Sequence, residues 1–258
     1  MPELFDMRLR ALRRDRAFHL GPELFLFERA FEDCIERISL LHRQFDRALL
    51  IGCPDPNWPG RLEGLARNVD TLDPGPLFAS AARGKTVVED RWEPAPRRYD
   101  LVLAIGTLDT VNDLPLALRL TAYAMGSDAL FLAAMSGGDT LPQLRAAMRA
   151  ADVLGAGAAA HVHPRIEASA LAALLADAGF INPVVDIDRV AVGYPSLDRL
   201  VGDLRQMGST NMLNARARFI GRAGRKAAAD AFRLAGNGSR TTETFEILHL
   251  ACWTPNQR

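Results

Sequence analysis

An apolar run that stops at a glycine marks the first place where this chain could hold a ligand. Residues 48–51 read Ala-Leu-Leu-Ile, and Gly52 and Cys53 then open a loop with prolines at positions 54, 56 and 59. The first strand of a parallel α/β sheet meets its ligand in this way. Such loops usually contain several glycines, which let the backbone approach the ligand. Only Gly52 lies at this turn, so the prolines predict that part of the ligand site differs from the usual glycine-rich loop.

Acidic residues close the next two predicted strands. Residues 68–73 form the second of these, and both Asp70 and Asp73 lie about twenty residues after Gly52, the offset of an acid that binds ribose hydroxyls. Because Pro74-Gly75-Pro76 follows, either acid could instead belong to a turn, and the two compete for the ribose role. Asp90 closes the third predicted strand, residues 85–90.

Two other groups of side chains could do chemistry. His161 and His163 could place two imidazoles on one side of a strand as metal ligands, but no third ligand has suitable spacing, so a surface or pocket-rim pair is favoured. Cys53 could be a nucleophile if a helix N-terminus stabilised its thiolate, but a small packing residue is the favoured interpretation. No metal site and no catalytic residue is assigned.

An alternation of strands and helices positions these candidate site residues. Apolar periodicity and turn residues predict helices before residue 44, and further helices at 58–66, up to 124, up to 151, and at 171–178, 196–207 and 215–234. Strands are predicted at 48–53, 68–73, 85–90, 99–105, 128–135, 183–192 and 242–253. This order is typical of a doubly wound, Rossmann-like α/β sheet of seven strands with its ligand at their carboxyl ends.

The predicted elements divide the chain into four parts of a single domain, residues 1–258. These parts are N-terminal helices (4–44), a core (46–193), a small helical cap inserted before the last strand (194–237) and that strand (242–253). The basic run on the cap could bind an acidic partner, although a solvated face is the favoured interpretation.

Composition narrows the classes of function. The chain has 31 basic and 31 acidic residues and a formal net charge of zero, which gives no electrostatic reason to expect a nucleic-acid partner. It shows no apolar run long enough for a transmembrane segment and no signal-peptide pattern. The three cysteines lack metal-binding spacing, so we expect a reducing, cytoplasmic setting.

Several segments together resemble one family. The strand order, the acids that end strands two and three and the final reversed hairpin resemble the class I S-adenosylmethionine-dependent methyltransferases. Within them, the chain is similar to the complex I assembly factor methyltransferase-like group and to its relatives, the biotin-synthesis carrier-protein methyltransferases. The segments that carry this resemblance are Phe5-Asp6, Arg14-Asp15-Arg16-Ala17, Thr110-Val111-Asn112-Asp113-Leu114-Pro115, Gly137-Gly138-Asp139-Thr140-Leu141-Pro142, Tyr194-Pro195-Ser196-Leu197 and Asp203-Leu204-Arg205-Gln206-Met207-Gly208-Ser209-Thr210-Asn211.

The resemblance implies S-adenosylmethionine as cofactor. Pro54 stands where the family has a second glycine, and the family's aspartate before that glycine segment is missing. The resemblance makes Asp70 the ribose acid with Asp73 as competitor, and it makes Asp90 the acid on the adenine side. The residues implied around the cofactor are Gly52, Cys53, Asp70, Asp73, Asp90, Ile105 and Gly106.

The resemblance also implies an activity and a partner. It predicts a methyltransferase-like protein that modifies a protein side chain during respiratory complex I assembly, with an iron–sulfur subunit of complex I as partner. In the assembly-factor relatives the modification falls on an arginine and is described as hydroxylation. A degenerate, non-catalytic fold retained as an assembly or binding factor is the alternative, which the prolines at 54 and 56 motivate.

Overall fold

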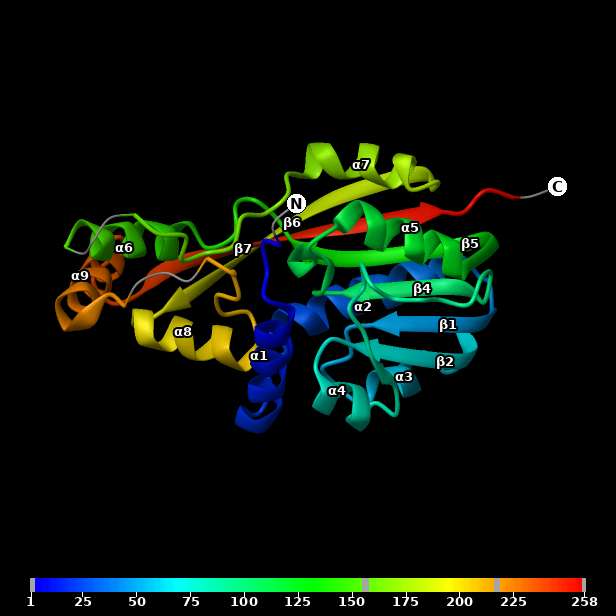
Figure 1. Cartoon of the computed structure of the whole chain (residues 1–258), viewed down its shortest axis with the longest axis horizontal. Coiled ribbons are helices and arrows are strands. Elements are labelled where there is room, and N and C mark those ends of the chain that lie inside the picture. The colour runs from blue at the N-terminus through cyan, green and yellow to red at the C-terminus, as the bar shows by residue number, and fades with distance from the viewer. Residues whose placement is uncertain (1–2, 155–157, 216–218, 257–258) are drawn as a thin grey trace.

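The computed structural model describes residues 3–154, 158–215 and 219–256, and a seven-stranded sheet runs through this part of the chain (Figure 1). The strands lie in the order β3-β2-β1-β4-β5-β7-β6. Their bounds are β1 Phe45–Ile51, β2 Ala66–Asp73, β3 Lys85–Thr86, β4 Tyr99–Ile105, β5 Met125–Ser136, β6 Ile181–Tyr194 and β7 Thr241–Trp253.

Helices follow most of the strands. They are α1 Met7–Leu20, α2 Phe25–Leu40, α3 Trp58–Arg61, α4 Pro76–Ala81, the 3₁₀ turn η1 Leu108–Thr110, α5 Leu114–Ala124, α6 Pro142–Val153, α7 Ala168–Asp177, α8 Leu197–Gln206 and α9 Gly221–Leu234. Local signals explain several of these bounds. Asp6 caps α1 by accepting the Leu9 N–H, and Asp113 caps α5 by accepting that of Leu116.

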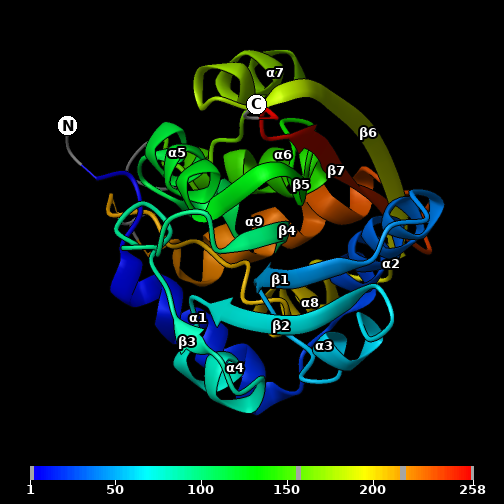
Figure 2. The same ribbon diagram turned by 90° about the vertical axis from the view of Figure 1, so that its right-hand side faces the viewer.

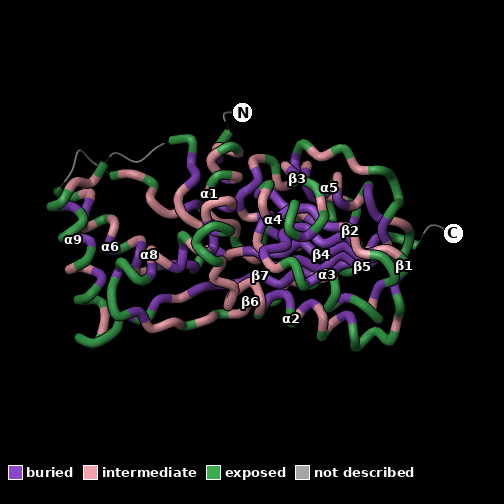
Figure 3. The backbone as a smooth tube through the Cα atoms, turned by 90° about the horizontal axis from the view of Figure 1, so that it is seen from below, coloured by how far each residue is buried: buried purple, intermediate pink, exposed green. Residues whose placement is uncertain are grey.

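The pairing of the strands confirms the predicted doubly wound sheet. β1 pairs in parallel with β2 and β4, while β7 pairs antiparallel with both β5 and β6. Apolar residues on the two faces of the central strands form two core clusters, one under α5 and α7 and the other under α2 and α3 (Figure 2). The tube view shows these buried strands at the centre of the molecule (Figure 3).

Several predicted bounds were wrong, including those of three elements that are shorter than predicted. The third strand has two residues instead of six, because Asp90 turns toward the loop at residues 112–113. Helix α3 ends at Arg61 instead of residue 66, because β2 already begins at Ala66. Helix α9 begins at Gly221 instead of residue 215, and residues 216–218 of that prediction lie outside the described residues.

Helix α1 is the element that closes the ligand edge of the sheet. Strands β1 and β2 point toward it, and it packs against α4 and α8 (Figure 1). Its Arg10 and Arg14 are one helical turn apart and therefore share a face. Both guanidinium groups are buried against acids, one at the end of β2 and one after β3.

Candidate functional site

Gly52 lies where β1 ends, as predicted, but the space beside it is already filled. Its φ is +81°, and a Cβ added there would lie 2.3 Å from the carbonyl oxygen of Ile105 and 2.6 Å from Cγ2 of Thr107. Its N–H donates to the carbonyl of Leu72 at 2.8 Å. Glycine is required here because the end of β4 approaches closely. The approaching group is the protein's own backbone.

The loop after Gly52 folds inward around Trp58. The indole is fully buried and stacks on Phe31, with ring centroids 4.2 Å apart, and its Nε1–H donates to Glu28 at 2.9 Å. Asp55 accepts the N–H of Asn57 at 2.8 Å. The prolines therefore belong to a compact, anchored turn.

Asp73 lies at the carboxyl end of β2, and its carboxylate is saturated by the protein. Oδ1 accepts from Arg14 Nε at 2.8 Å and from the Gly75 N–H at 2.7 Å. Oδ2 accepts from Arg14 Nη2 at 2.5 Å and from the Cys53 N–H at 2.9 Å. The side chain is 0 % exposed, so no acceptor position faces an open pocket.

Asp70 lies three residues earlier in β2, opposite Leu49 of β1. Its carboxylate pairs with Arg98 at 2.8 Å and accepts from the Tyr99 hydroxyl at 3.1 Å. Burial, followed by the Asp70 charge, raises the pKa of Tyr99 to about 12. Of the two competing acids, Asp73 is the one at the carboxyl end of the strand.

The acids after β3 also have protein partners. Glu89 forms a bidentate ion pair with Arg10, with Nη1–Oε2 and Nη2–Oε1 distances of 2.6 and 2.8 Å. Arg10 donates further to Thr110 and to the carbonyl of Thr107. Asp90 Oδ2 accepts the N–H groups of residues 112 and 113, while its buried Oδ1 has no hydrogen-bond partner among the described residues.

Ile105 and Gly106 end β4 as predicted, and α2 covers them. Ile105 is fully buried. Gly106 has φ +63°, and a Cβ there would lie 2.4 Å from Cε1 of Phe27. The aromatic ring of Phe27 therefore covers Gly106 on the side where a Cβ would lie.

These contacts decide whether S-adenosylmethionine fits this edge. The orphaned oxygen of Asp90 could accept a hydrogen bond from an adenine amino group. However, Asp73 has no acceptor position left for a ribose, and on the Cβ side of Gly52 and Gly106 protein atoms lie 2.3 and 2.4 Å from where a Cβ would stand. In this arrangement the residues do not fit the ribose and methionine parts of the cofactor.

The sequence interpretation missed Arg10, Arg14 and Glu89. A signal was present in the four-residue spacing of the two arginines, which predicts one shared helix face. Their acids lie 79 and 59 residues away along the chain, so no local pattern could have paired them.

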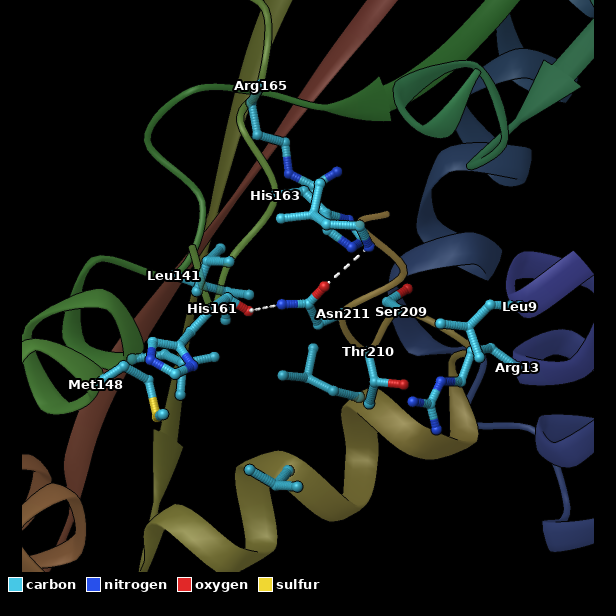
Figure 4. Close-up of a pocket in the computed structure, with 15 residues that line it drawn as sticks. Leu9, Arg13, Leu141, Met148, His161, His163, Arg165, Ser209, Thr210 and Asn211 are labelled. Atoms are coloured by element: carbon cyan, nitrogen blue, oxygen red, sulfur yellow. Dashed lines mark hydrogen bonds between the residues drawn. The ribbon is translucent and has the colours of Figure 1, made fainter. Parts of the chain in front are cut away.

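A separate cavity of about 450 Å³ lies between α1, α6, α8 and the segment at 209–213 (Figure 4). His161 and His163 border it but have different partners. His161 Nε2 lies 2.7 Å from an Asp152 oxygen, whereas His163 Nε2 accepts the Met212 N–H at 3.0 Å. Burial, followed by the charge of Arg165, lowers the pKa of His163 to about 4. Among the described residues, no group of His, Cys, Asp and Glu could hold a metal ion.

Arg165 lies between the cavity and the ligand edge of the sheet that α1 closes, which we call the cofactor edge. It borders both the cavity and a smaller recess lined by Arg10, Arg14 and Gly106. Its guanidinium forms a buried ion pair with Asp109.

Within the part of the chain that the structure describes, no helix is both long and apolar enough to cross a bilayer.

Comparison with known proteins identifies relatives over most of the chain. A family model described as "Methyltransferase domain" matches residues 24–182. The zebrafish (Danio rerio) protein "Arginine-hydroxylase NDUFAF5, mitochondrial" is 36% identical over 98% of this chain and 83% of its own length. A "Malonyl-[acyl-carrier protein] O-methyltransferase" of Laribacter hongkongensis is 29% identical over 74% of this chain and 69% of its own.

Solved structures share the fold. The YcgJ protein of Bacillus subtilis superimposes with a TM-score of 0.58 at 11% identity, over 86% of this chain and 97% of that one. The N-methyltransferase NodS of Bradyrhizobium japonicum, solved with S-adenosyl-L-homocysteine, has a TM-score of 0.50 at 14% identity, over 96% and 99% of the two chains. These likenesses confirm the class I methyltransferase fold.

Proposed function

Because the chain belongs to the methyltransferase domain family and its own Arg14 occupies the acid that ends β2, we propose that this methyltransferase-like protein works as a non-catalytic binding factor. The role we propose is in assembly of respiratory complex I, with an iron–sulfur subunit as the protein partner. Relatives named arginine-hydroxylase NDUFAF5 support this context, since they align with nearly the whole chain.

The observation that carries this proposal is the saturated carboxylate of Asp73. A ribose hydroxyl could reach it only by displacing Arg14, which would leave two buried charges unpaired. Breaking a buried pair costs about 3–5 kcal/mol. Cofactor binding would have to offset that cost, together with the cost of moving the ring of Phe27 and the compact 54–57 turn.

Calorimetric titration of the full chain tests this proposal. S-adenosylmethionine and S-adenosylhomocysteine at millimolar concentration should release no saturable heat and should not shift the melting temperature. A methyltransferase of the same fold, titrated in the same buffer, shows that the cofactor preparation is active. Saturable binding at one site per chain would overturn the non-catalytic proposal.

A second measurement addresses the partner. Tagged protein should recover an iron–sulfur subunit of complex I from the native organism, and a recovery that contains no complex I subunit would contradict the assembly role. The cofactor titration and this recovery can fail independently, so each tests its own part of the proposal.

An enzymatic function is the second candidate, because a relative at 36% identity is named an arginine-hydroxylase. Mass spectrometry of the recovered subunit separates the possibilities. A gain of one oxygen on an arginine that depends on this chain would indicate hydroxylation, and a gain of one methylene would indicate methyl transfer. An unmodified arginine in a stable complex supports the binding role.

The cysteines bear on the compartment. Cys34, Cys53 and Cys252 are free and buried. Three unpaired thiols suit a reducing compartment, and we propose a cytoplasmic location on that ground.

A further inference from the structure

The cavity beside α1 has the size and the walls of a small-molecule site. Its volume of about 450 Å³ falls in the range of sites that enclose one small organic ligand, whereas a protein partner requires a wider surface. Most of its wall is apolar and comes from five separate parts of the fold. These apolar residues are Leu9, Leu141, Leu144, Met148, Val162, Val201, Leu204 and Leu213.

The polar part of the wall is basic. Among the described residues that line the cavity, the ionisable side chains are Arg13, Arg165, His161 and His163, and none is acidic. Figure 4 shows Arg165 and His163 together at one end, and Arg13 beside Thr210 at another. A ligand that fills this space therefore meets the guanidinium groups of Arg13 and Arg165, while the carboxylates of Asp109 and Asp152 lie against Arg165 and His161.

The surroundings of the cavity add to its positive potential. Burial, and then repulsion by Arg13 and Arg205, lowers the pKa of Arg16, which donates to Thr210 on the cavity wall. The pKa of Arg145 is lowered in the same way, by burial and then by Arg165 and Arg149. Burial is the larger cause of both shifts, and the repulsion among these arginines is the part that an added anion would relieve.

Arg165 offers a specific contact for such an anion. Its side chain is 4% exposed, and one terminal nitrogen is paired with Asp109. Its buried Nε–H has no hydrogen-bond partner among the described residues. An unsatisfied buried donor is costly, and a bound acceptor would remove that cost.

From this arrangement we infer that the cavity binds an amphipathic carboxylate, a small organic acid with an apolar chain. Its carboxylate lies near Arg165, and its chain packs along Leu141, Met148 and Val201. The site adjoins the cofactor edge through Arg165, and α1 contributes Leu9 and Arg13 to its wall, so this inference concerns the arrangement in which α1 keeps that edge closed.

Titration calorimetry with decanoate near neutral pH, below its micelle concentration, tests the inference. We expect saturable binding of one decanoate per chain, binding at least roughly tenfold weaker for the neutral decanol, and no saturable binding of the cationic decylamine, because charge-assisted hydrogen bonds are the strong ones. No saturable binding of decanoate, or equal binding of decanol, would overturn the inference.

Two variants separate the head and the chain of the ligand, and a third is the control. Val201→Trp fills the apolar part of the cavity and should abolish binding. Arg165→Lys keeps a charge beside Asp109 but removes the Nε–H donor, and it should weaken decanoate binding by about tenfold while leaving decanol unaffected. Arg222→Gln, which removes an exposed charge on α9, should leave binding unchanged.

Melting curves of each variant verify folding before titration. If Arg165→Lys fails to fold, Arg13→Gln takes its place, since Arg13 also borders the cavity, and it should weaken decanoate binding selectively. Unchanged binding by a folded Val201→Trp variant would place decanoate elsewhere and contradict the inference.

Discussion

Arg14 in α1 and Asp73 at the end of β2 form a bidentate ion pair in which both side chains are buried, with exposed fractions of 7% and 0%. The same carboxylate accepts the backbone N–H groups of residues 53 and 75. One carboxylate therefore joins the first helix, the β1 loop and the turn after β2. In this chain, the acid that ends β2 holds protein segments together.

Replacing Arg14 with Leu should destabilise the protein strongly. The substitution leaves the Asp73 carboxylate buried without its cation, and breaking such a pair costs about 3–5 kcal/mol. Urea denaturation should show a loss of this size in the free energy of unfolding. The double variant with Asp73→Asn should recover part of the loss, because no buried charge is left unpaired.

An exposed pair on the same strand provides the control. Arg98→Leu breaks the pair with Asp70, whose side chain is 40% exposed. Solvent screens this pair, so the loss should be far smaller than for Arg14→Leu. Equal losses for the two variants would contradict the account of the buried pair.

Gly52→Ala should also be severely destabilising, for a steric reason. Its φ of +81° disfavours any side chain, and the new Cβ would lie 2.3 Å from the Ile105 carbonyl oxygen. The conformational cost alone is about 1–3 kcal/mol, and relief of the clash requires β1 and β4 to separate. Thermal unfolding followed by circular dichroism measures the loss.

Gly21→Ala is the matched control for this clash. Gly21 has a similar φ of +83°, but a Cβ there meets nothing within 4 Å. The Gly21→Ala variant should therefore show the conformational cost of the positive φ without a steric clash. If Gly21→Ala lowers the melting temperature as much as Gly52→Ala does, the close approach of β4 does not explain the requirement for glycine.

Local patterns predicted most of the fold. The strand at 99–105 has the predicted bounds, because a continuous apolar run between polar flanks defines a strand covered on both faces. The first strand was predicted to end at residue 53 by the same reasoning, and β1 ends at Ile51. Hydrophobic periodicity is a short-range property, so it can be recognised from neighbouring residues alone.

The contents of the site could not be predicted in this way. Arg10 and Arg14 are ordinary basic residues in sequence, and their roles depend on Glu89 and Asp73, which are far along the chain. His161 and His163 are two residues apart, yet their rings bind Asp152 and the backbone at residue 212. Ion pairing depends on tertiary contacts, which spacing alone does not specify.

The three cysteines should resist alkylation in the native protein. Burial raises the pKa of the Cys34, Cys53 and Cys252 thiols to about 12, and for Cys53 the Asp73 charge adds to the effect. The thiolate is the reactive form, so iodoacetamide in mildly alkaline buffer should modify none of them. In urea all three thiols should react, and mass spectrometry measures the number of alkylated cysteines. Rapid labelling of native Cys53 would instead support the nucleophile interpretation.

His163 should make stability depend on pH in mildly acidic solution. Its folded pKa is lowered to about 4 from 6.5, chiefly by burial and then by Arg165, while Asp109 acts in the opposite direction. Between these values the unfolded chain binds the proton more readily. The neutral imidazole therefore contributes at most about 3 kcal/mol to the free energy of unfolding. This contribution is complete above pH 6.5 and is lost as the pH falls toward 4.

The variant His163→Gln isolates this effect, because the amide oxygen can still accept the Met212 N–H but does not titrate. Urea denaturation across this window should show a shallower loss of stability for His163→Gln than for the wild-type chain. His249 also has a lowered pKa and remains in both proteins, so the difference between the two curves reports His163 alone. His19→Gln, at an exposed position in the last turn of α1, should retain the wild-type slope. Parallel curves for His163→Gln and wild type would mean that the buried imidazole does not titrate differently in the folded and unfolded states.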